Sequence, residues 1–193
     1  MPRLFIAIDF PSDIQDQLLE LCDFSLNSAS WVEHFHLTVQ FVGEVDQIMF
    51  EEIKETLAEI QEPAFSITLR GLGFFPPRKQ PRVLWVGIEK NEALHHLKVK
   101  IDHRLQGLRL SPDKRKFHPH ITLARLNNPS DDEVGAYLSR YSLFKTNPIP
   151  VAEFSLFSSF LSSHGAIHTE EARYLLSRKN KTNWNSVDHT RDS

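Results

Sequence analysis

The chain has 193 residues, of which 40% are hydrophobic and 24% charged, a balance typical of a globular protein of one domain or two closely packed lobes. Its single cysteine, Cys22, excludes an internal disulfide, and the net charge of −3 argues against indiscriminate nucleic-acid binding. The N-terminal apolar stretch, interrupted by Asp9 and Pro11, is too short for a signal peptide or membrane span, so a cytoplasmic protein without membrane contact is expected.

The first half of the chain alternates between strand and helix patterns. Residues 3–10 form a short apolar run that predicts a strand, and Ser12 begins a capping-box pattern that predicts a helix. A second strand is expected over 35–42, followed by a helix that Asp46 caps and whose apolar residues recur at helical spacing. A third strand is expected over 64–73, before prolines that indicate a turn.

The second half predicts the same order of elements. It begins with a strand over 82–89 and continues with a helix that Asn91 caps. A strand after His118, a helix capped by Ser130 in a second capping-box pattern, and a strand from Val151 follow. Each half therefore reads strand, helix, strand, helix, strand.

The spacing between matching features is constant. His36 and His120 are 84 residues apart (120 − 36), and the caps Asp46 and Ser130 are also 84 residues apart (130 − 46). Agreement between separate elements favours an internal duplication over two chance similarities.

We therefore predict an α+β fold of two lobes related by a pseudo-twofold axis. Each lobe is expected to be a β-sheet with outer helices, and the two lobes are expected to face each other across a central cleft. The prediction is one bilobal domain over residues 1–178, with repeats of roughly 3–75 and 82–162. Residues 179–193 are polar and aperiodic, which predicts a loose tail. The sequence does not specify the oligomeric state, and a monomer is the default expectation.

One phrase occurs twice, as HFHLTVQF at residues 34–41 and as HPHITLAR at residues 118–125. Two His-x-His pairs alone mean little in a chain with 10 His, but the shared aliphatic–Thr–aliphatic continuation is not readily supplied by chance. Because side chains alternate along a strand, His36, Thr38 and Gln40 are expected on one face, with Phe41 among the aliphatic residues on the other.

The second copy has the same alternation. His118, His120, Thr122 and Ala124 are expected to share one face of their strand, opposite the aliphatic residues. Arg125 has the opposite parity in a regular strand, so it reaches the His face only through a twist or a β-bulge. The aliphatic faces are expected to pack on helices, which leaves the His and Thr side chains directed into the cleft.

Two opposed imidazoles suit phosphodiester cleavage. With an ordinary pKa of about 6.5, one His can accept a proton from the attacking oxygen while the other donates one to the leaving oxygen. The candidate catalytic pair is His36 and His120; the hydroxyls of Thr38 and Thr122 can bind phosphate oxygens, and Arg125 can add a charged contact. This chemistry requires neither a metal nor another cofactor, and no Gly-rich phosphate loop is present in the sequence.

Two alternatives belong to other classes of function. His-x-His on a strand can place two imidazoles on one metal ion, although the Thr after each second His has no role there. A non-catalytic RNA-binding module is the other, because eight Lys or Arg residues stand against two Asp between Lys98 and Arg125. Phe74, Phe75 and Trp31 are candidates for stacking on a base.

The two phrases, HLTVQFVGE and HPHITLAR, closely resemble the paired His-x-Thr motifs of the 2H phosphoesterases. More narrowly, the chain resembles the LigT-like RNA 2′,3′-cyclic phosphodiesterases, once described as 2′-5′ RNA ligases. The similarity extends over RLFIAIDFP, LRGLGFFPPRKQPRVLWVGIE, FSLFSSFLSSHG and YLLSR, which leaves mainly the tail uncovered. The LigT-like fold, two α+β lobes around a central cleft, agrees with the duplication.

The resemblance implies a metal-independent hydrolase that opens a 2′,3′-cyclic phosphate at an RNA end, including ends of tRNA fragments, to a 2′-phosphomonoester. By similarity, His36 is the proton donor, His120 the proton acceptor, and Thr38, Thr122 and Arg125 bind phosphate. Ligation of 2′-5′ linked RNA, or action on another cyclic nucleotide, is the alternative activity. His168 stands near where the family tends to have an aromatic residue.

Overall fold

The computed structural model describes residues 3–76, 80–110, 116–162 and 165–177. Within these ranges the chain forms four helices and ten strands. In chain order they are β1 (Arg3–Asp9), α1 (Ser12–Leu19), β2 (Ala29–Trp31), β3 (His36–Glu44), α2 (Gln47–Ala58), β4 (Phe65–Ile67), β5 (Leu69–Phe75), β6 (Val83–Ile88), α3 (Glu92–Gly107), β7 (His120–Leu126), α4 (Asp131–Arg140), β8 (Ile149–Val151), β9 (Glu153–Ser162) and β10 (Gly165–Leu175). The tail predicted over 179–193 lies outside the described residues and stays a prediction.

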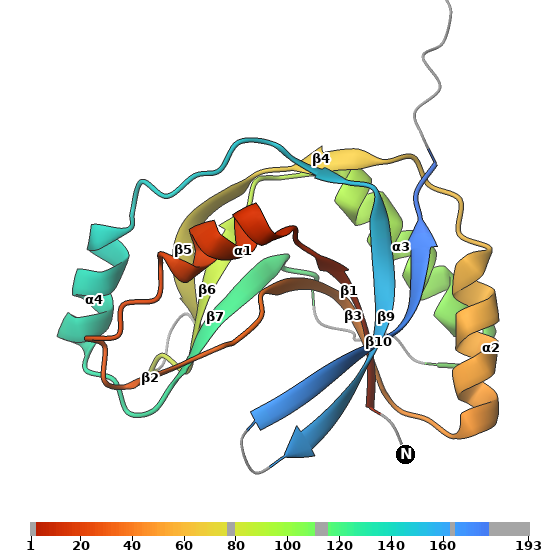
Figure 1. Cartoon of the computed structure of the whole chain (residues 1–193), viewed down its shortest axis with the longest axis horizontal. Helices are drawn as coiled ribbons and strands as arrows, with labels where there is room; N and C mark the ends of the chain where they lie inside the picture. Colours follow the sequence, from red (N-terminus) through yellow and green to blue (C-terminus); the bar gives the residue numbers. More distant parts are fainter. Residues whose placement is uncertain (1–2, 77–79, 111–115, 163–164, 178–193) are drawn as a thin grey trace, which may run out of the picture.

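One antiparallel sheet contains most of the strands, in the order β10-β9-β1-β3-β7-β6-β5, with β2 paired to β7. β3 and β7, which carry the two His phrases, meet at only one recorded residue pair, Leu37 with Ile121. This narrow junction divides the sheet into lobe 1 (β10, β9, β1 and β3) and lobe 2 (β7, β6, β5 and β2), which diverge from each other in Figure 1. The predicted α+β fold with two lobes is confirmed, although one continuous sheet runs through both lobes.

The strand order is symmetric about the junction. Outward from it, lobe 1 has β3, β1 and β9, and lobe 2 has the matching β7, β6 and β5. The third strand of each lobe comes from the other half of the chain, whereas the sequence suggested that each half forms its own lobe. The crossing between lobes occurs at β4 and β8, which form a separate antiparallel pair. These strands lie just before β5 and β9, so the chain crosses the pseudo-twofold axis once in each half. Among the described residues of the first half, β10 has no counterpart.

The helices follow the same exchange. In Figure 1, α2 and α3 lie beside lobe 1, and α1 and α4 lie beside lobe 2. The contact between α4 and the turn after α1 includes a buried hydrogen bond of 2.9 Å, in which the hydroxyl of Tyr137 donates to the carbonyl oxygen of Leu21. No helix in the described part of the chain is long and apolar enough to span a membrane.

Three of the four predicted caps are correct. The side chains of Asp46, Asn91 and Ser130 accept from the backbone at the starts of α2, α3 and α4, and Ser130 forms a complete capping box. The fourth is wrong, because α1 has no side-chain cap. The side chain of Gln15, expected in that capping box, instead bonds to the backbone of Phe35.

Three cations of the basic run that begins at Lys98 lie on α3 and form ion pairs with nearby carboxylates: Lys98 with Asp102, Lys100 with Glu62 and Arg104 with Glu59. The last two pairs join α3 to the end of α2 and the residues after it. These two pairs therefore contribute to the contact between α3 and the end of α2, and surface pairs of this kind stabilise a fold only slightly.

Candidate functional site

Strand β3 begins at His36 and does not alternate regularly. β1 pairs with Thr38 and next with Gln40, so Val39 is an extra residue in a β-bulge. Beyond the bulge, Gln40 is only 3% exposed and Phe41 is 60% exposed. The prediction that Gln40 shares the face of His36 and Thr38, with Phe41 on the core face, is therefore wrong, because the bulge reverses the parity.

Strand β7 has the same irregularity at the equivalent position. β6 pairs with Thr122 and next with Ala124, which makes Leu123 the extra residue. Ala124 is fully buried, so its predicted place beside His120 is also wrong. The bulge places Arg125 on the same face as Thr122, which the sequence analysis expected only if a twist or a bulge was present. The side chain of Arg125 is exposed.

The matched bulges make Phe41 and Arg125 equivalent, since they are 84 residues apart (125 − 41). The catalytic candidates are repeated in both halves, but at this position one half supplies an aromatic ring and the other a cation. The two sides of the site therefore have different chemistry.

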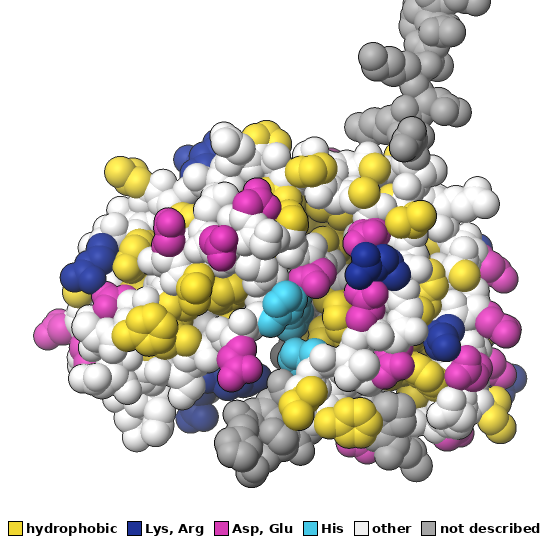
Figure 2. Space-filling view, viewed as in Figure 1, with side chains coloured by type: hydrophobic (Ala, Val, Ile, Leu, Met, Phe, Trp, Pro, Cys, Tyr) yellow, Lys and Arg dark blue, Asp and Glu magenta, His cyan; other side chains and the backbone are white. Residues whose placement is uncertain are grey.

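The junction brings the four principal candidates around one point. Because β3 and β7 are antiparallel, the neighbours of the Leu37–Ile121 pair are His36 opposite Thr122, and Thr38 opposite His120. All four side chains are on the face opposite the buried Leu37 and Ile121. Figure 2 shows His side chains gathered at a hollow in the middle of this face, between the two lobes.

His36 is largely enclosed by two rings. Its ring centroid lies 5.2 Å from that of Phe5 and 5.5 Å from that of His168, the latter in an edge-to-face arrangement. Burial is the main cause that lowers the pKa of His36 to about 4; positive charge on His168 and His34 acts in the same direction, and Asp9 opposes it. The imidazole of His36 is therefore neutral near pH 7 in the unliganded protein.

His120 has a different environment. Its ring lies 4.9 Å from that of Phe75, edge to face, and its Nδ1 lies 2.7 Å from the backbone oxygen of His118. Since a carbonyl only accepts, Nδ1 carries a proton in this contact, and Nε2 of the neutral ring is left as an acceptor. Burial lowers the pKa of His120, and the bond to the His118 carbonyl partly offsets this.

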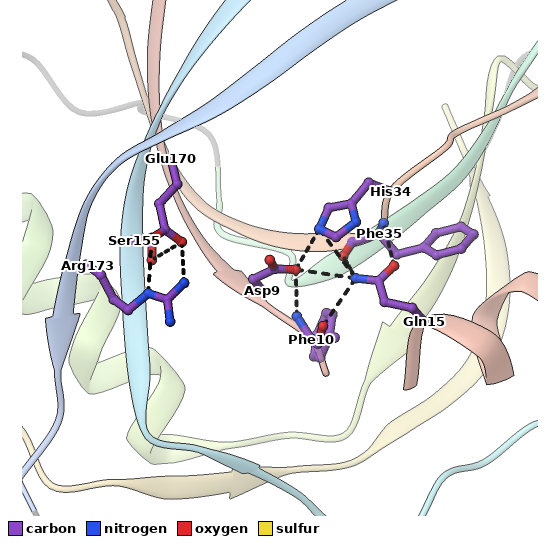
Figure 3. Close-up of polar contacts among 8 residues, drawn as sticks. All are labelled: Asp9, Phe10, Gln15, His34, Phe35, Ser155, Glu170 and Arg173. Atoms are coloured by element: carbon purple, nitrogen blue, oxygen red, sulfur yellow. Dashed lines mark hydrogen bonds and ion pairs between the residues drawn. The ribbon is translucent and has the colours of Figure 1, made fainter. Parts of the chain in front are cut away.

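A polar cluster holds the chain where it enters β3 (Figure 3). One carboxylate oxygen of Asp9 accepts from the backbone N–H of Phe10 at 2.7 Å and lies 2.8 Å from Nε2 of His34. Gln15 donates to the carbonyl of Phe35 at 2.8 Å and accepts from its N–H at 3.0 Å. These bonds fix the residue that precedes His36, so Gln15 and Asp9 support its position.

Strand β10 adds groups to one side of the site only. It places His168 beside Phe5 and His36, and it contributes Glu170 and Arg173, which bond to each other near Ser155 (Figure 3). His120 has one imidazole close by, that of His118, whose ring centroid lies 6.4 Å away. Strand β10 pairs with β9 at the edge of lobe 1, so the groups that it contributes lie on the His36 side.

Sequence reasoning placed some of these residues and missed others. Of the proposed stacking residues, Phe75 lies at the site, while Trp31 packs on Tyr137 away from it. Phe5 and Trp85 were missed, because a buried or half-buried aromatic residue in a strand has the same sequence pattern whether it packs in the core or beside a site. Among the described residues, no three His, Cys, Asp or Glu side chains are grouped so that they could hold a metal ion.

Residues 14–159 match the family model described as the 2′-5′ RNA ligase superfamily. Among curated proteins, the chain is 36% identical over 138 residues to the RNA 2′,3′-cyclic phosphodiesterase of Aeropyrum pernix, covering 70% of this chain and 78% of that one. It is 34% identical over 173 residues to the protein of the same name from Thermotoga maritima, covering 86% and 91%.

Solved structures agree with these similarities. The crystal structure of TT0787 from Thermus thermophilus superimposes with a TM-score of 0.76 at 26% identity, covering 92% of this chain and 100% of that one. The structure of LigT from E. coli in its apo form gives a TM-score of 0.75 at 25% identity, covering 92% and 99%. The expected LigT-like architecture is thus confirmed.

Proposed function

The chain belongs to the 2′-5′ RNA ligase superfamily, and on this basis we propose that it is a hydrolase that opens a 2′,3′-cyclic phosphate at an RNA end to a 2′-phosphomonoester. The observation that carries the proposal is the β3–β7 junction, where each half of the chain supplies one His and one Thr around a single point. The relatives named RNA 2′,3′-cyclic phosphodiesterase support the same reaction. The catalytic unit that we propose spans residues 1–178 as one domain.

In the proposed mechanism, His120 is the base. Its Nδ1–H is held by the carbonyl of His118, so Nε2 faces the site as an acceptor for a proton of the attacking water. The water oxygen bonds to phosphorus, and the bond from phosphorus to the 3′-oxygen breaks. His36 donates a proton to that leaving oxygen, and the phosphate stays on the 2′-oxygen.

The proton on His36 arrives together with the substrate. In the unliganded protein the pKa of His36 is about 4, mainly because its ring is buried. The negative charge of a bound phosphodiester favours the imidazolium form, which raises this pKa in the complex. We propose that Thr38, Thr122 and Arg125 bind the non-bridging phosphate oxygens and stabilise the charge that develops on them.

The reaction can be tested with a short RNA that ends in a 2′,3′-cyclic phosphate, incubated with the protein in EDTA and followed by phosphorus NMR. We expect complete conversion to the 2′-phosphomonoester, which reports the reaction, the bond that breaks and the absence of a metal requirement. Formation of the 3′-phosphomonoester would contradict the direction of opening. Activity that appears only after zinc or manganese is added would favour the metal-site alternative.

We expect Arg125→Ala to lower kcat/KM by about 10- to 10²-fold, because hydrogen bonds to a charged group are worth about 1.5–3 kcal/mol. Arg125→Lys should recover only part of this loss, since an ammonium group cannot make a bidentate contact. Steady-state rates with the cyclic phosphate measure the effect. Arg82→Ala, which removes an exposed cation of the neighbouring chain segment, is the matched control and should leave the rate unchanged. Equal losses in the two variants would remove Arg125 from the site.

Ligation is the second candidate activity. A 5′-hydroxyl of another RNA then replaces water as the attacking group on the His120 side, and the product is a 2′-5′ phosphodiester. The aromatic surroundings of His120 favour this candidate, because water needs no such surface.

A further inference from the structure

Three rings form an aromatic cluster beside His120, which we call the lobe 2 cluster: Phe75 from β5, Trp85 from β6 and His118 just before β7. The ring centroids of Phe75 and Trp85 are 5.2 Å apart, and His118 lies 5.4 Å from Phe75 and 5.2 Å from Trp85. Phe75 and Trp85 are partly exposed, and His118 is exposed. The cluster therefore presents aromatic surface to the site.

The backbone under the cluster is shaped to hold the indole close to the sheet. A Cβ atom at Gly73, the residue paired with Trp85, would lie 2.3 Å from the indole ring, and one at Gly87 would lie 3.3 Å from it. The ring thus occupies space that any side chain at Gly73 would fill. This packing places the indole of Trp85 directly against β5 at Gly73.

The corresponding place in lobe 1 is built differently. Ala7 pairs with Thr38 as Trp85 pairs with Thr122, and Ser155 is the neighbour of Ala7 where Gly73 is the neighbour of Trp85. The pseudo-twofold symmetry therefore does not extend to the indole. At this position an indole ring is present on the His120 side alone, whereas the aromatic rings near His36 come from other positions.

The proposed mechanism determines what can lie there. His36 protonates the leaving 3′-oxygen, so the nucleoside that carries the cyclic phosphate binds on the His36 side, next to Phe5, Phe41 and His168. His120 accepts the proton of the attacking group, so the attacking molecule approaches on the side of the lobe 2 cluster. A stacked nucleobase gains about 1–3 kcal/mol on an aromatic surface of this kind.

We propose that the lobe 2 cluster is a subsite for the nucleobase of an attacking RNA 5′-hydroxyl end. This inference rests on the proposed function and gives its ligation reaction a second substrate site. The 5′-oxygen bonds to phosphorus as the bond from phosphorus to the 3′-oxygen breaks. The proton of the 5′-hydroxyl passes to His120, and His36 gives one to the 3′-oxygen, so the step needs no further reactant.

The test uses the full chain, an RNA with a 2′,3′-cyclic phosphate and increasing amounts of a 5′-hydroxyl trinucleotide, with ligation and hydrolysis products measured together. We expect the ligation rate to reach a plateau as the trinucleotide concentration increases. The hydrolysis rate should decrease over the same concentration range. An acceptor that lacks the first base should need about 5- to 150-fold more to saturate, given the stacking energy of about 1–3 kcal/mol. This comparison needs no variant. Ligation that rises linearly with the trinucleotide, or that saturates at the same amount of both acceptors, would overturn the subsite.

Variants locate the subsite on the protein. Trp85→Leu should lower the ratio of ligation to hydrolysis by at least about fivefold. Phe24→Leu, at an aromatic residue 74% exposed on the same lobe and packed on Trp31 away from the site, is the control and should leave the ratio unchanged. If Trp85→Leu slows both reactions equally, the cluster binds the cyclic-phosphate nucleoside and the proposal is wrong. Absence of hydrolysis by the unaltered chain would instead overturn the proposed function itself.

Discussion

His120→Ala is expected to lower kcat for the cyclic phosphate by at least about 10²-fold, the scale of general acid–base catalysis. His120 holds its Nδ1 proton on the carbonyl of His118, so only its Nε2 is placed to accept a proton from the attacking water. No other group described beside it is oriented in this way. His36→Ala should have a loss of the same order, because the leaving 3′-oxygen then has no proton donor.

The two losses should not add. A proton donor and a proton acceptor act on the same step, so once one is missing the other contributes little, and the double variant should be close to either single variant. Single-turnover rates with a short RNA measure the chemical step directly. His95→Ala, an exposed His on α3, is the control and should keep full activity. A His120→Ala protein that keeps near-normal turnover would defeat the assignment, provided that circular dichroism shows the same fold.

The repeated order of elements follows from the sequence because helix caps and apolar spacing are local signals. Asp46 and Ser130 cap their helices as predicted, and the 84-residue offset that relates them (130 − 46) also relates the two His strands. The exchange of β5 and β9 between lobes does not follow, because which strands pair depends on contacts far apart in the sequence. The local sequence pattern of a strand does not specify which strand it pairs with in the sheet.

Some residues of the site could be placed from the sequence and others could not. His36, His120, Thr38 and Thr122 could be placed from alternation because they precede the bulges. Residues after the bulges could not, since one inserted residue exchanges the two faces of a strand. Gln40 and Phe41 changed faces for this reason.

The direction of the reaction was also beyond the sequence, because a symmetric pair of His can work either way round. The structure removes that symmetry with groups that come from distant segments. The carbonyl of His118 orients one imidazole, and His168 of the unrepeated strand β10 contacts the other. These differences support His120 as the base and His36 as the acid.

The pH dependence of kcat/KM is expected to be bell-shaped, with its maximum below the ordinary His pKa of about 6.5. The reaction requires that one of the two His is protonated and the other is neutral. In the unliganded protein burial lowers the pKa of His36 to about 4 and also lowers the pKa of His120. Below both pKa values both rings are protonated and the base is lost; above both, neither ring is protonated and the acid is lost.

The expected change is large on the alkaline side. Above the higher pKa the singly protonated form falls tenfold for each pH unit, so kcat/KM should drop about 10²-fold between pH 6.5 and pH 8.5. The kcat profile, which reports the bound complex, should have its maximum at higher pH, since phosphate raises the pKa of both His. Initial rates between pH 4 and pH 9 measure both profiles. A kcat/KM that is flat from pH 5 to pH 9 would exclude the two-His mechanism.

The variant His168→Phe tests how His168 affects the pH profile of kcat/KM. It keeps an aromatic ring beside Phe5 and removes only the ionisable group. Charge on His168 is one of the causes that lower the pKa of His36, while His34 and Asp9, which also face His36, stay in place. The acid limb of kcat/KM should therefore move to higher pH in the variant, and the alkaline limb should move less if it belongs to His120. A movement of the alkaline limb alone would mean that His168 acts on His120, which the position of β10 beside lobe 1 does not allow.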